Sequence, residues 1–332
     1  MTTFAHYPSL RDRTVLITGG ATGIGACLVE QFAAQGARVG FLDIDADAGA
    51  ALAQHLAGSR HAPLFVLADL TDIAALERGI DAVRQHFGPI GVLLNNAAND
   101  QRHKVEDTTP ESWDAGIAVN LKHQFFAAKD VAADMRQAGG GSIVNFGSVS
   151  WMLKMGGMPV YTTAKAAVQG LTRSLARDFG PFNIRVNTLV PGWVMTDKQL
   201  RLWVTDAGRA DIARGQCLQQ LVMPEHIARM ALFLASDDSA MCTAQDFVVD
   251  GGWVRPGFWR VNKDNTMKTA IRLAKLDDFT AWLPLWQGYQ AFYKTAIPPS
   301  VTELTWARFH QPGDMHCAMA DARVQYRRHA PV

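Results

Sequence analysis

The sequence predicts an α/β protein with a doubly wound parallel sheet. Short apolar runs that are typical of strands alternate with longer helical stretches between residues 13 and 250. Such alternation favours a parallel sheet with right-handed crossovers. Runs such as 92–94 and 184–190 are too apolar for a sheet with one face in water, which indicates strands covered by helices on both faces. The 332 residues leave room for one large domain and a smaller added segment.

Each predicted strand is an apolar run that is followed by glycine, proline or polar residues. In chain order, the expected strands are 13–18, 38–43, 63–68, 91–95, 142–147, 184–190 and 245–250. The intervening stretches have helical character, and the expected helices are 23–35, 46–57, 73–86, 111–136, 160–178 and 224–235. Ligands of open α/β sheets bind beyond the carboxyl ends of the strands, so the residues that follow these runs are the first candidates for a site.

The first strand leads into a glycine-rich turn, residues 19–25, which reads Gly-Gly-Ala-Thr-Gly-Ile-Gly and opens the helix 23–35. Strand, glycine turn and helix start are the context of a dinucleotide-binding turn. Glycines allow the backbone to approach a pyrophosphate, and the amino end of the helix supplies N–H groups and a positive dipole. The first candidate cofactor-binding residues are therefore Gly19, Thr22, Gly23, Ile24 and Gly25.

The second strand ends at Asp43, and this position predicts the choice of cofactor. In a dinucleotide-binding sheet, an acidic residue here hydrogen-bonds the ribose hydroxyls of the adenosine. Its charge would repel a 2′-phosphate, and neither residues 20–22 nor Ile44 offer a cation to bind one. NAD is thus the expected cofactor, in preference to NADP. The alternative is that Asp43 merely caps the helix 46–57.

Tyr161, Lys165 and Ser148 are candidate catalytic residues. Tyr161 and Lys165 are four residues apart in the helix 160–178, so they share one face. A free phenol has a pKa near 10, and a neighbouring ammonium is expected to lower the pKa of Tyr161. The phenol could then exchange a proton with an alcohol near neutral pH. Ser148 follows the fifth strand and should lie at the carboxyl edge of the sheet.

These motifs together resemble the short-chain dehydrogenase/reductase family over roughly residues 8–254. The glycine turn and the segments 95–98, 191–192 and 250–252 match its motifs in order, with Ala98 in place of the usual glycine. The resemblance implies a Rossmann sheet of about seven strands whose order reverses beside the first strand. It implies a catalytic tetrad of Asn120, Ser148, Tyr161 and Lys165. It also implies cofactor contacts at Asp69, Leu70, Asn96, Ala97, Tyr161, Lys165, Pro191, Gly192, Val194 and Thr196.

Two of these residues have plain structural alternatives. Asp69 could equally be a carboxylate that stabilises a turn or caps a helix. Asn120 falls inside the expected helix 111–136, where asparagine has a poor propensity, so a helix bulge or a bound water is expected there. In the family, this asparagine holds a water in a proton relay, and a purely structural role is the alternative.

The segment 99–103 after the fourth strand, Asn-Asp-Gln-Arg-His, is dense in hydrogen-bonding groups. Sugar sites combine such groups with aromatic platforms, because a pyranose has hydroxyl edges and a C–H face. Tryptophans stand close to other candidate residues, at Trp151 after Ser148 and at Trp193 after Gly192. The predicted substrate-binding residues are Asn99, His103, Ser148, Trp151, Tyr161 and Trp193. The alternative is that 99–103 is a solvated surface loop.

Several segments, among them 7–10, 95–103 and 234–238, also resemble the bacterial aldose 1-dehydrogenase branch of the family. This resemblance implies oxidation of a pyranose or furanose sugar at its anomeric carbon to an aldonolactone. Two other functions stay open. One is reduction of another carbonyl substrate, such as a 3-oxoacyl thioester, which apolar groups near 99–103 would favour. The other is a nucleotide-sensing or bifunctional acyl-transfer protein. The intact tetrad argues against a pure sensor, and the missing acetyl-CoA loop argues against acyl transfer.

Composition limits the partners. A formal net charge of +1 offers no electrostatic case for nucleic acid or an anionic membrane. No apolar run is long enough to span a bilayer, and residues 1–13 lack the apolar segment of a signal peptide. The four cysteines are isolated, and the adjacent His316 and Cys317 have no further ligand nearby, so no metal site is expected. A cytoplasmic protein is expected, and family habit implies a homodimer or homotetramer.

Composition shifts after the last strand, so residues 1–258 are expected to form the dehydrogenase domain and 259–332 a linker with an added segment. Five of the nine tryptophans lie from residue 253 onward. The stretch 269–293 resembles the first strand and helices of a GNAT-type acetyltransferase, but no acetyl-CoA pyrophosphate loop follows it. A truncated, inactive remnant is therefore expected. Its helix should carry one apolar face with Trp282, Trp286, Tyr289, Phe292 and Tyr293.

Overall fold

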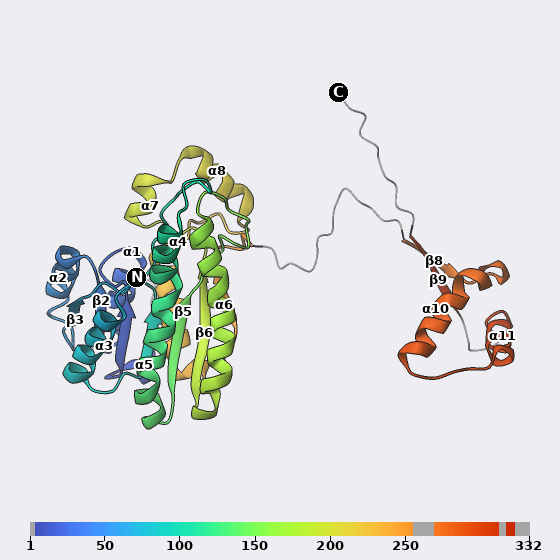
Figure 1. Cartoon of the computed structure of the whole chain (residues 1–332), viewed down its shortest axis with the longest axis horizontal. Helices are drawn as coiled ribbons and strands as arrows, with labels where there is room; N and C mark the ends of the chain where they lie inside the picture. Colours follow the sequence, from blue (N-terminus) through green and yellow to red (C-terminus); the bar gives the residue numbers. More distant parts are fainter. Residues whose placement is uncertain (1–3, 255–268, 312–316, 323–332) are drawn as a thin grey trace. The chain divides into compact units, whose positions relative to one another are not determined.

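The computed structural model describes residues 4–254, 269–311 and 317–322. The chain divides into two compact units, Met1–Arg255 and Pro256–Val332 (Figure 1). The first unit carries every motif from which the nucleotide-binding sheet was predicted. The second carries the aromatic-rich stretch.

The first unit is built on a seven-stranded sheet, which confirms the predicted fold. Its strand order is β3-β2-β1-β4-β5-β6-β7, so the order reverses between β1 and β4. All six pairs of neighbouring strands are parallel. Thr18 pairs with Leu42 on one side and with Asn95 on the other, so these three strands end at one edge. The strands are β1 (Thr14–Thr18), β2 (Arg38–Asp43), β3 (Leu64–Leu67), β4 (Val92–Asn95), β5 (Gly141–Phe146), β6 (Ile184–Pro191) and β7 (Asp246–Val249).

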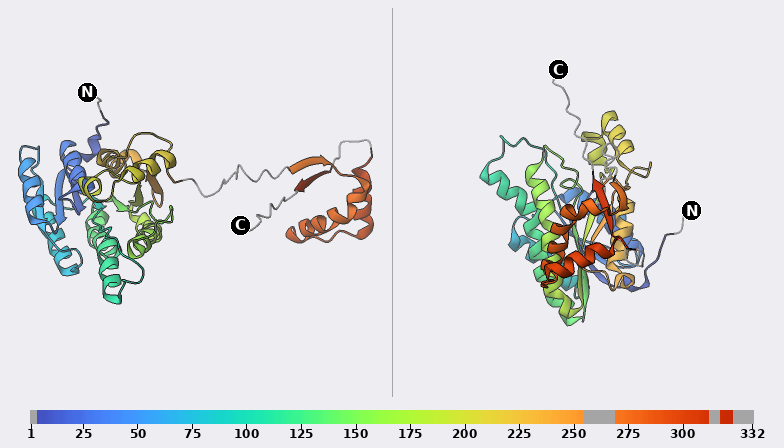
Figure 2. Two further views of the ribbon diagram at one scale, coloured as in Figure 1. Left: turned by 90° about the horizontal axis from the view of Figure 1, so that it is seen from above. Right: turned by 90° about the vertical axis from the view of Figure 1, so that its right-hand side faces the viewer.

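Helices cover both faces of this sheet, as Figures 1 and 2 show. The buried core on one face includes side chains from α1, α2 and α9, and the core on the other includes side chains from α3, α5 and α6. Every residue of the central strands β1, β4 and β5 is buried, which is why their sequences are so apolar. The helices are α1 (Gly23–Ala34), α2 (Ala46–His55), α3 (Ile73–Phe87), α5 (His123–Gln137), α6 (Pro159–Phe179) and α9 (Pro224–Ala235).

The expected helix 111–136 is interrupted. It consists of α4 (Pro110–Ile117), a π-helical turn (Ala118–Lys122) and α5. The turn contains Asn120, so the bulge expected at this residue is present. Single π-helical turns inside α-helices frequently mark functional sites.

Two helices after β6 were not predicted, α7 (Asp197–Leu202) and α8 (Asp206–Gly215). They are short and mostly polar, and therefore lack the apolar periodicity that marks the longer helices. Each begins at a threonine whose hydroxyl accepts a backbone N–H of the first turn, Thr196 for α7 and Thr205 for α8. Such caps stabilise helices that have little apolar surface to bury.

The second unit contains a two-stranded antiparallel sheet of β8 (Thr269–Leu273) and β9 (Ala318–Ala322). Its helices are α10 (Phe279–Phe292) and α11 (Pro299–Arg308), and Figure 2 shows this unit in orange and red. Across the described residues, no helix is long and apolar enough to cross a membrane.

The aromatic side chains predicted for one face of α10 do line up along it. The Trp282 and Trp286 ring centroids are 5.3 Å apart, and those of Trp286 and Tyr289 are 5.6 Å apart. Trp282 is buried against Trp306 of α11, with 4.8 Å between ring centroids. Phe292, by contrast, is 79% exposed. The face is therefore closed at one end by α11 and open at the other.

Candidate active site

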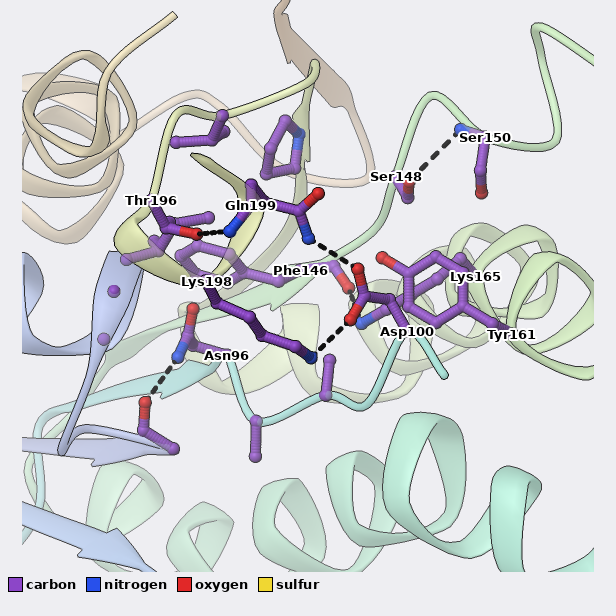
Figure 3. A pocket seen from close by; sticks show the side chains of 18 of the residues that line it. Asn96, Asp100, Phe146, Ser148, Ser150, Tyr161, Lys165, Thr196, Lys198 and Gln199 are labelled. Atoms are coloured by element: carbon purple, nitrogen blue, oxygen red, sulfur yellow. Dashed lines mark hydrogen bonds and ion pairs between the residues drawn. The ribbon is translucent and has the colours of Figure 1, made fainter. Parts of the chain in front are cut away.

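A cavity of about 680 Å³ opens at the carboxyl ends of the strands of the first unit (Figure 3). It is lined by the glycine turn, by the segments that follow β2 to β6, and by α6. The predicted site residues that line it are Gly19, Thr22, Gly23, Ile24, Gly25, Asp43, Asp69, Leu70, Asn96, Ala97, Ser148, Tyr161, Lys165, Pro191, Gly192, Trp193, Val194 and Thr196. Those that lie outside the lining are Asn99, His103, Asn120 and Trp151.

At two glycines of the turn, Gly19 and Gly25, a side chain does not fit. A Cβ on Gly25 would lie 1.8 Å from the carbonyl oxygen of Gly19, and a Cβ on Gly19 would lie 2.6 Å from the Cα of Ala97. Gly19 also has a φ of 68°, in the left-handed region. At the amino end of α1, the Thr22 side chain makes no capping hydrogen bond. The first N–H groups of α1 are therefore available to an anionic ligand, as a dinucleotide pyrophosphate requires.

Hydrogen bonds tie this turn to the segment after β4. The Thr18 hydroxyl accepts the backbone N–H groups of Asn96 and Ala97, at 3.1 and 3.2 Å. In return, the Asn96 side chain donates to the carbonyl of Gly19 at 2.8 Å. Asn96, which follows the neighbouring strand β4, thus helps to fix the conformation of the glycine turn.

Asp43 lies at the end of β2 and faces the same turn. Its carboxylate accepts the N–H groups of Ala21 at 2.8 Å and Asp45 at 3.0 Å. The residue that caps α2 is Asp45, whose side chain accepts the N–H of Ala48. The capping alternative for Asp43 is therefore wrong.

Asp69 lines the cavity and also stabilises a turn. Its carboxylate accepts both the N–H and the hydroxyl of Thr71, at 2.9 and 2.8 Å. The cap of α3 is a different residue, Asp72. Of the two structural alternatives for Asp69, the turn is thus observed and the cap is not.

Ser148, Tyr161 and Lys165 all line the cavity. Tyr161 and Lys165 stand one turn apart near the start of α6, and the Lys165 ammonium lies 5.8 Å from the Tyr161 ring centroid. Lys165 is 1% exposed and donates to the carbonyl of Phe146 at 2.8 Å. The Ser148 oxygen accepts the N–H of Ser150 at 3.1 Å. The three functional groups are held by the end of β5 and the start of α6.

The proton affinity of Tyr161 differs from the expectation. Burial raises the pKa of Tyr161 to about 12, although the Ser148 hydroxyl opposes the rise. The charge of Asp100 raises this pKa further, and that of Arg102 lowers it. Burial also lowers the pKa of Lys165 to about 7, so the ammonium is itself disfavoured at neutral pH. The prediction that Lys165 brings the pKa of Tyr161 towards neutrality is wrong for this structure.

Asn120 is 2% exposed, and its side chain hydrogen-bonds the backbone of the loop after β4. Its amide oxygen accepts the N–H of Asn99 at 2.9 Å, and its amide nitrogen donates to the carbonyls of Asn99 and Gly116, at 3.0 and 2.9 Å. The neighbouring Val119 of the π-helical turn lines the cavity. Asn120 therefore holds the loop that forms one wall of the site.

The polar loop 99–103 contributes different residues than expected. Asp100 and Arg102 line the cavity, whereas the Asn99 side chain is exposed. His103 instead donates its backbone N–H to Gly157 at 2.9 Å. The loop 99–103 is thus not a fully solvated surface loop, but only some of its residues line the cavity. Its sequence density in polar residues pointed to the right segment, but nothing in the sequence indicated which side chains turn inward.

Lys198 and Gln199 of α7 are cavity residues that sequence reasoning missed. The Asp100 carboxylate accepts the Lys198 ammonium at 2.6 Å and the Gln199 side-chain amide at 2.7 Å (Figure 3). These partners are 98 and 99 positions away in the chain, and α7 has no pattern that predicts it. No local signal could have identified them.

Comparisons with known proteins agree with this geometry. A family model described as enoyl-(acyl carrier protein) reductase matches residues 19–254. A protein of Rhizobium meliloti named probable galactose dehydrogenase is 48% identical over 249 residues, 75% of this chain and 97% of that protein. The D-xylose 1-dehydrogenase of Caulobacter vibrioides is 47% identical over 249 residues, 75% of this chain and 98% of that protein.

A solved structure extends the agreement to the fold. A short-chain type dehydrogenase/reductase from Mycobacterium ulcerans superposes with a TM-score of 0.71 at 28% identity, covering 74% of this chain and 91% of that one. The family model ends at residue 254 and so lends no support to the acetyltransferase resemblance of the second unit. With its parallel sheet, glycine turn and Ser-Tyr-Lys cavity, the chain belongs to the short-chain dehydrogenase/reductase family and is an oxidoreductase that acts on CH–OH groups.

Proposed function

We propose that this protein uses NAD to oxidise an aldose at its anomeric carbon, with an aldonolactone as the product. The observation that carries the proposal is the composition of the cavity around Ser148 and Tyr161. Charged groups that can bind hydroxyls, such as Asp100 and Arg102, share it with the indole of Trp193, and sugars need both kinds of contact. The relatives named galactose dehydrogenase and D-xylose 1-dehydrogenase support this substrate class.

NAD is proposed over NADP because of Asp43. Its carboxylate lies in the cavity wall beside the glycine turn, where it suits ribose hydroxyls as an acceptor. The next residue, Ile44, is 69% exposed and apolar. A 2′-phosphate placed here would face a negative charge without a cation from Ala21, Thr22 or Ile44.

The proposed chemistry assigns one task to each residue. The dinucleotide supplies the hydride acceptor when bound. Ser148 donates a hydrogen bond to the substrate oxygen and steadies the developing carbonyl, while the Oη of Tyr161 takes the hydroxyl proton. Lys165, in its charged ammonium form, stabilises the Tyr161 phenolate. Proton transfer to a positioned group contributes about 10²–10⁴ in rate, and holding the reacting groups in place supplies much of the rest.

An anomeric hydroxyl suits this arrangement. The ring oxygen of the sugar stabilises the carbonyl character that develops on the oxidised carbon. Oxidation at this carbon therefore depends less on Tyr161 than oxidation of a simple alcohol would. This matters because the raised pKa of Tyr161 leaves little phenolate at neutral pH.

The rate of oxidation should rise with pH. Because the pKa of Tyr161 is about 12, its phenolate is the minor form at neutral pH. The fraction of phenolate then increases by up to about tenfold for each pH unit. We expect kcat/KM for sugar oxidation to increase from pH 7 to pH 9, measured at saturating NAD. A maximum near pH 6 followed by a decline would instead mean that charged Lys165, whose pKa is about 7, limits the reaction.

Substitution of Asp43 tests the cofactor assignment. We expect Asp43→Ser to weaken NAD binding and to improve NADP binding, because the ribose acceptor and the repulsion of a 2′-phosphate are lost together. The preference for NAD should narrow by about tenfold or more, as expected for a charged hydrogen bond. The ratio of kcat/KM for the two cofactors measures this. A wild-type enzyme that already prefers NADP would refute the assignment.

The decisive experiment for the proposed function is NADH formation across a panel of aldoses. We expect at least one pentose or hexose to be oxidised, with its lactone recovered as the product. Activity with no aldose, together with reduction of a 3-oxoacyl thioester, would replace this function by the alternative carbonyl reductase.

Removal of the second unit should leave the reaction intact. All described residues that line the cavity fall between Gly19 and Trp253. A chain that ends near residue 258 should therefore keep its activity per folded site, and the full chain should transfer no acetyl group from acetyl-CoA. A shortened protein that folds and binds NAD but does not turn over would show that the second unit contributes to the site.

A further inference from the structure

Asp100 joins the two sides of the cavity. It lies on the loop after β4, and its two carboxylate oxygens accept from Lys198 and Gln199 at the start of α7, at 2.6 and 2.7 Å. The Asp100 side chain is 22% exposed and that of Lys198 is 50% exposed. Asp100 is thus the more deeply placed partner, and its carboxylate faces the interior of the site (Figure 3).

The orientation of this contact is fixed by a chain of hydrogen bonds. The indole N–H of Trp193 donates to the Gln199 amide oxygen at 2.9 Å. An indole nitrogen can only donate, so the opposite end of the amide, its NH₂ group, must face Asp100. The Gln199 backbone is held in turn by the Thr196 hydroxyl at 3.3 Å. Asp100 therefore receives a donor from the same residue that positions the aromatic wall.

The carboxylate retains capacity for a ligand. An ionised carboxylate has about four acceptor sites, and Lys198 and Gln199 account for two of them. Hydrogen bonds from hydroxyls to a carboxylate are short and about twice as strong as those between neutral groups. The partners of Asp100 keep its pKa below the ordinary value although burial opposes them, so it remains an acceptor at neutral pH.

Asp100 lines the same cavity as the hydroxyl of Tyr161. The negative charge of Asp100 raises the pKa of the Tyr161 phenol, and the positive charge of Arg102 lowers it. Both residues line the cavity that contains Tyr161. A substrate whose hydroxyl is held by Tyr161 would therefore lie in the cavity that Asp100 lines.

We propose that Asp100 binds the hydroxyl on the carbon next to the one that is oxidised, and that this contact selects sugars over substrates that lack a hydroxyl there. The inference rests on the proposed function for the identity of the substrate. In an aldose oxidised at its anomeric carbon, the group read by Asp100 is the 2-hydroxyl. A site built to hydrogen-bond a hydroxyl rejects the analogue without it, because its own polar group is left unpaired.

The test compares one aldose with its 2-deoxy counterpart in the same protein. The aldose is the best substrate of the panel, and the readout is the ratio of the two kcat/KM values. Changes in the proton chemistry of Tyr161 affect both substrates and cancel in this ratio. The variant is Asp100→Asn, which keeps the shape of the side chain. The matched control is Asp107→Asn, an exposed residue of the same loop outside the cavity lining.

We expect the wild-type protein and Asp107→Asn to prefer the full sugar by about tenfold to a hundredfold. Asp100→Asn should lose most of this preference, while its Kd for NAD in the absence of sugar stays unchanged. An equal fall in both rates, with the ratio preserved, would mean that Asp100 only holds the loop to α7 and would overturn the proposal. So would a wild-type protein that does not distinguish the two sugars.

The proposed function and this inference can fail separately. If the wild-type protein oxidises no aldose, the proposed function is refuted. The role of Asp100 is then measured with cyclohexane-1,2-diol against cyclohexanol, which differ by the same neighbouring hydroxyl. A preference for the diol that disappears in Asp100→Asn supports the role of Asp100, and a preference that persists, or none in the wild-type protein, overturns it.

Discussion

Replacement of Tyr161 by phenylalanine should reduce turnover by about 10²–10⁴ while NAD still binds. The substitution removes only the hydroxyl, so the ring keeps its place beside Lys165 and the cavity keeps its shape. What is lost is the group that takes the substrate proton in the proposed chemistry. Initial rates of NADH formation measure the effect, and calorimetric titration with NAD measures whether the cofactor site remains.

The control for this experiment is Tyr7→Phe. Tyr7 lies outside the cavity lining, and the same atom is removed from it. This variant should have the wild-type rate and the wild-type affinity for NAD. If Tyr161→Phe also turned over at a near-normal rate, the proton would have to leave by another group, and the proposed chemistry would be wrong.

Gly25→Ala should damage the cofactor site severely. Its new methyl group would lie 1.8 Å from the carbonyl oxygen of Gly19 and 2.9 Å from the Nδ2 of Asn96. Neither can move freely, since the Asn96 amide already donates to the Gly19 carbonyl. The turn must therefore open, at a cost of about 1–3 kcal/mol. We expect the Kd for NAD to rise by about tenfold to a hundredfold, with a lower Tm.

Gly170→Ala is the matched control for this substitution. Gly170 lies inside α6, and a Cβ there would meet nothing within 4 Å. Alanine favours a helix over glycine by about 1 kcal/mol, so this variant should keep its affinity for NAD and melt slightly higher. Wild-type binding of NAD by Gly25→Ala would show that the turn does not hold the cofactor.

Elements that repeat a strong local pattern could be predicted from the sequence. Strands buried on both faces are mostly apolar, so β1, β4 and β6 are visible as runs in which apolar residues predominate. The glycine turn is visible because side chains do not fit at its glycines Gly19 and Gly25, and Tyr161 with Lys165 because helical spacing places them on one face. The order of these motifs along the chain was then enough to predict the family. It was also enough to predict that the cavity lies at the carboxyl ends of the strands.

The protonation states and the walls of the site, by contrast, depend on the tertiary packing. Motif spacing cannot report desolvation, so the raised pKa of Tyr161 and the lowered pKa of Lys165 required the burial of both groups. Likewise, Asp100 meets Gln199 across 99 positions, through a short polar helix without apolar periodicity. Contacts of this range depend on how loops from different strands fold over the sheet, and that is a property of the packed chain rather than of any segment of its sequence.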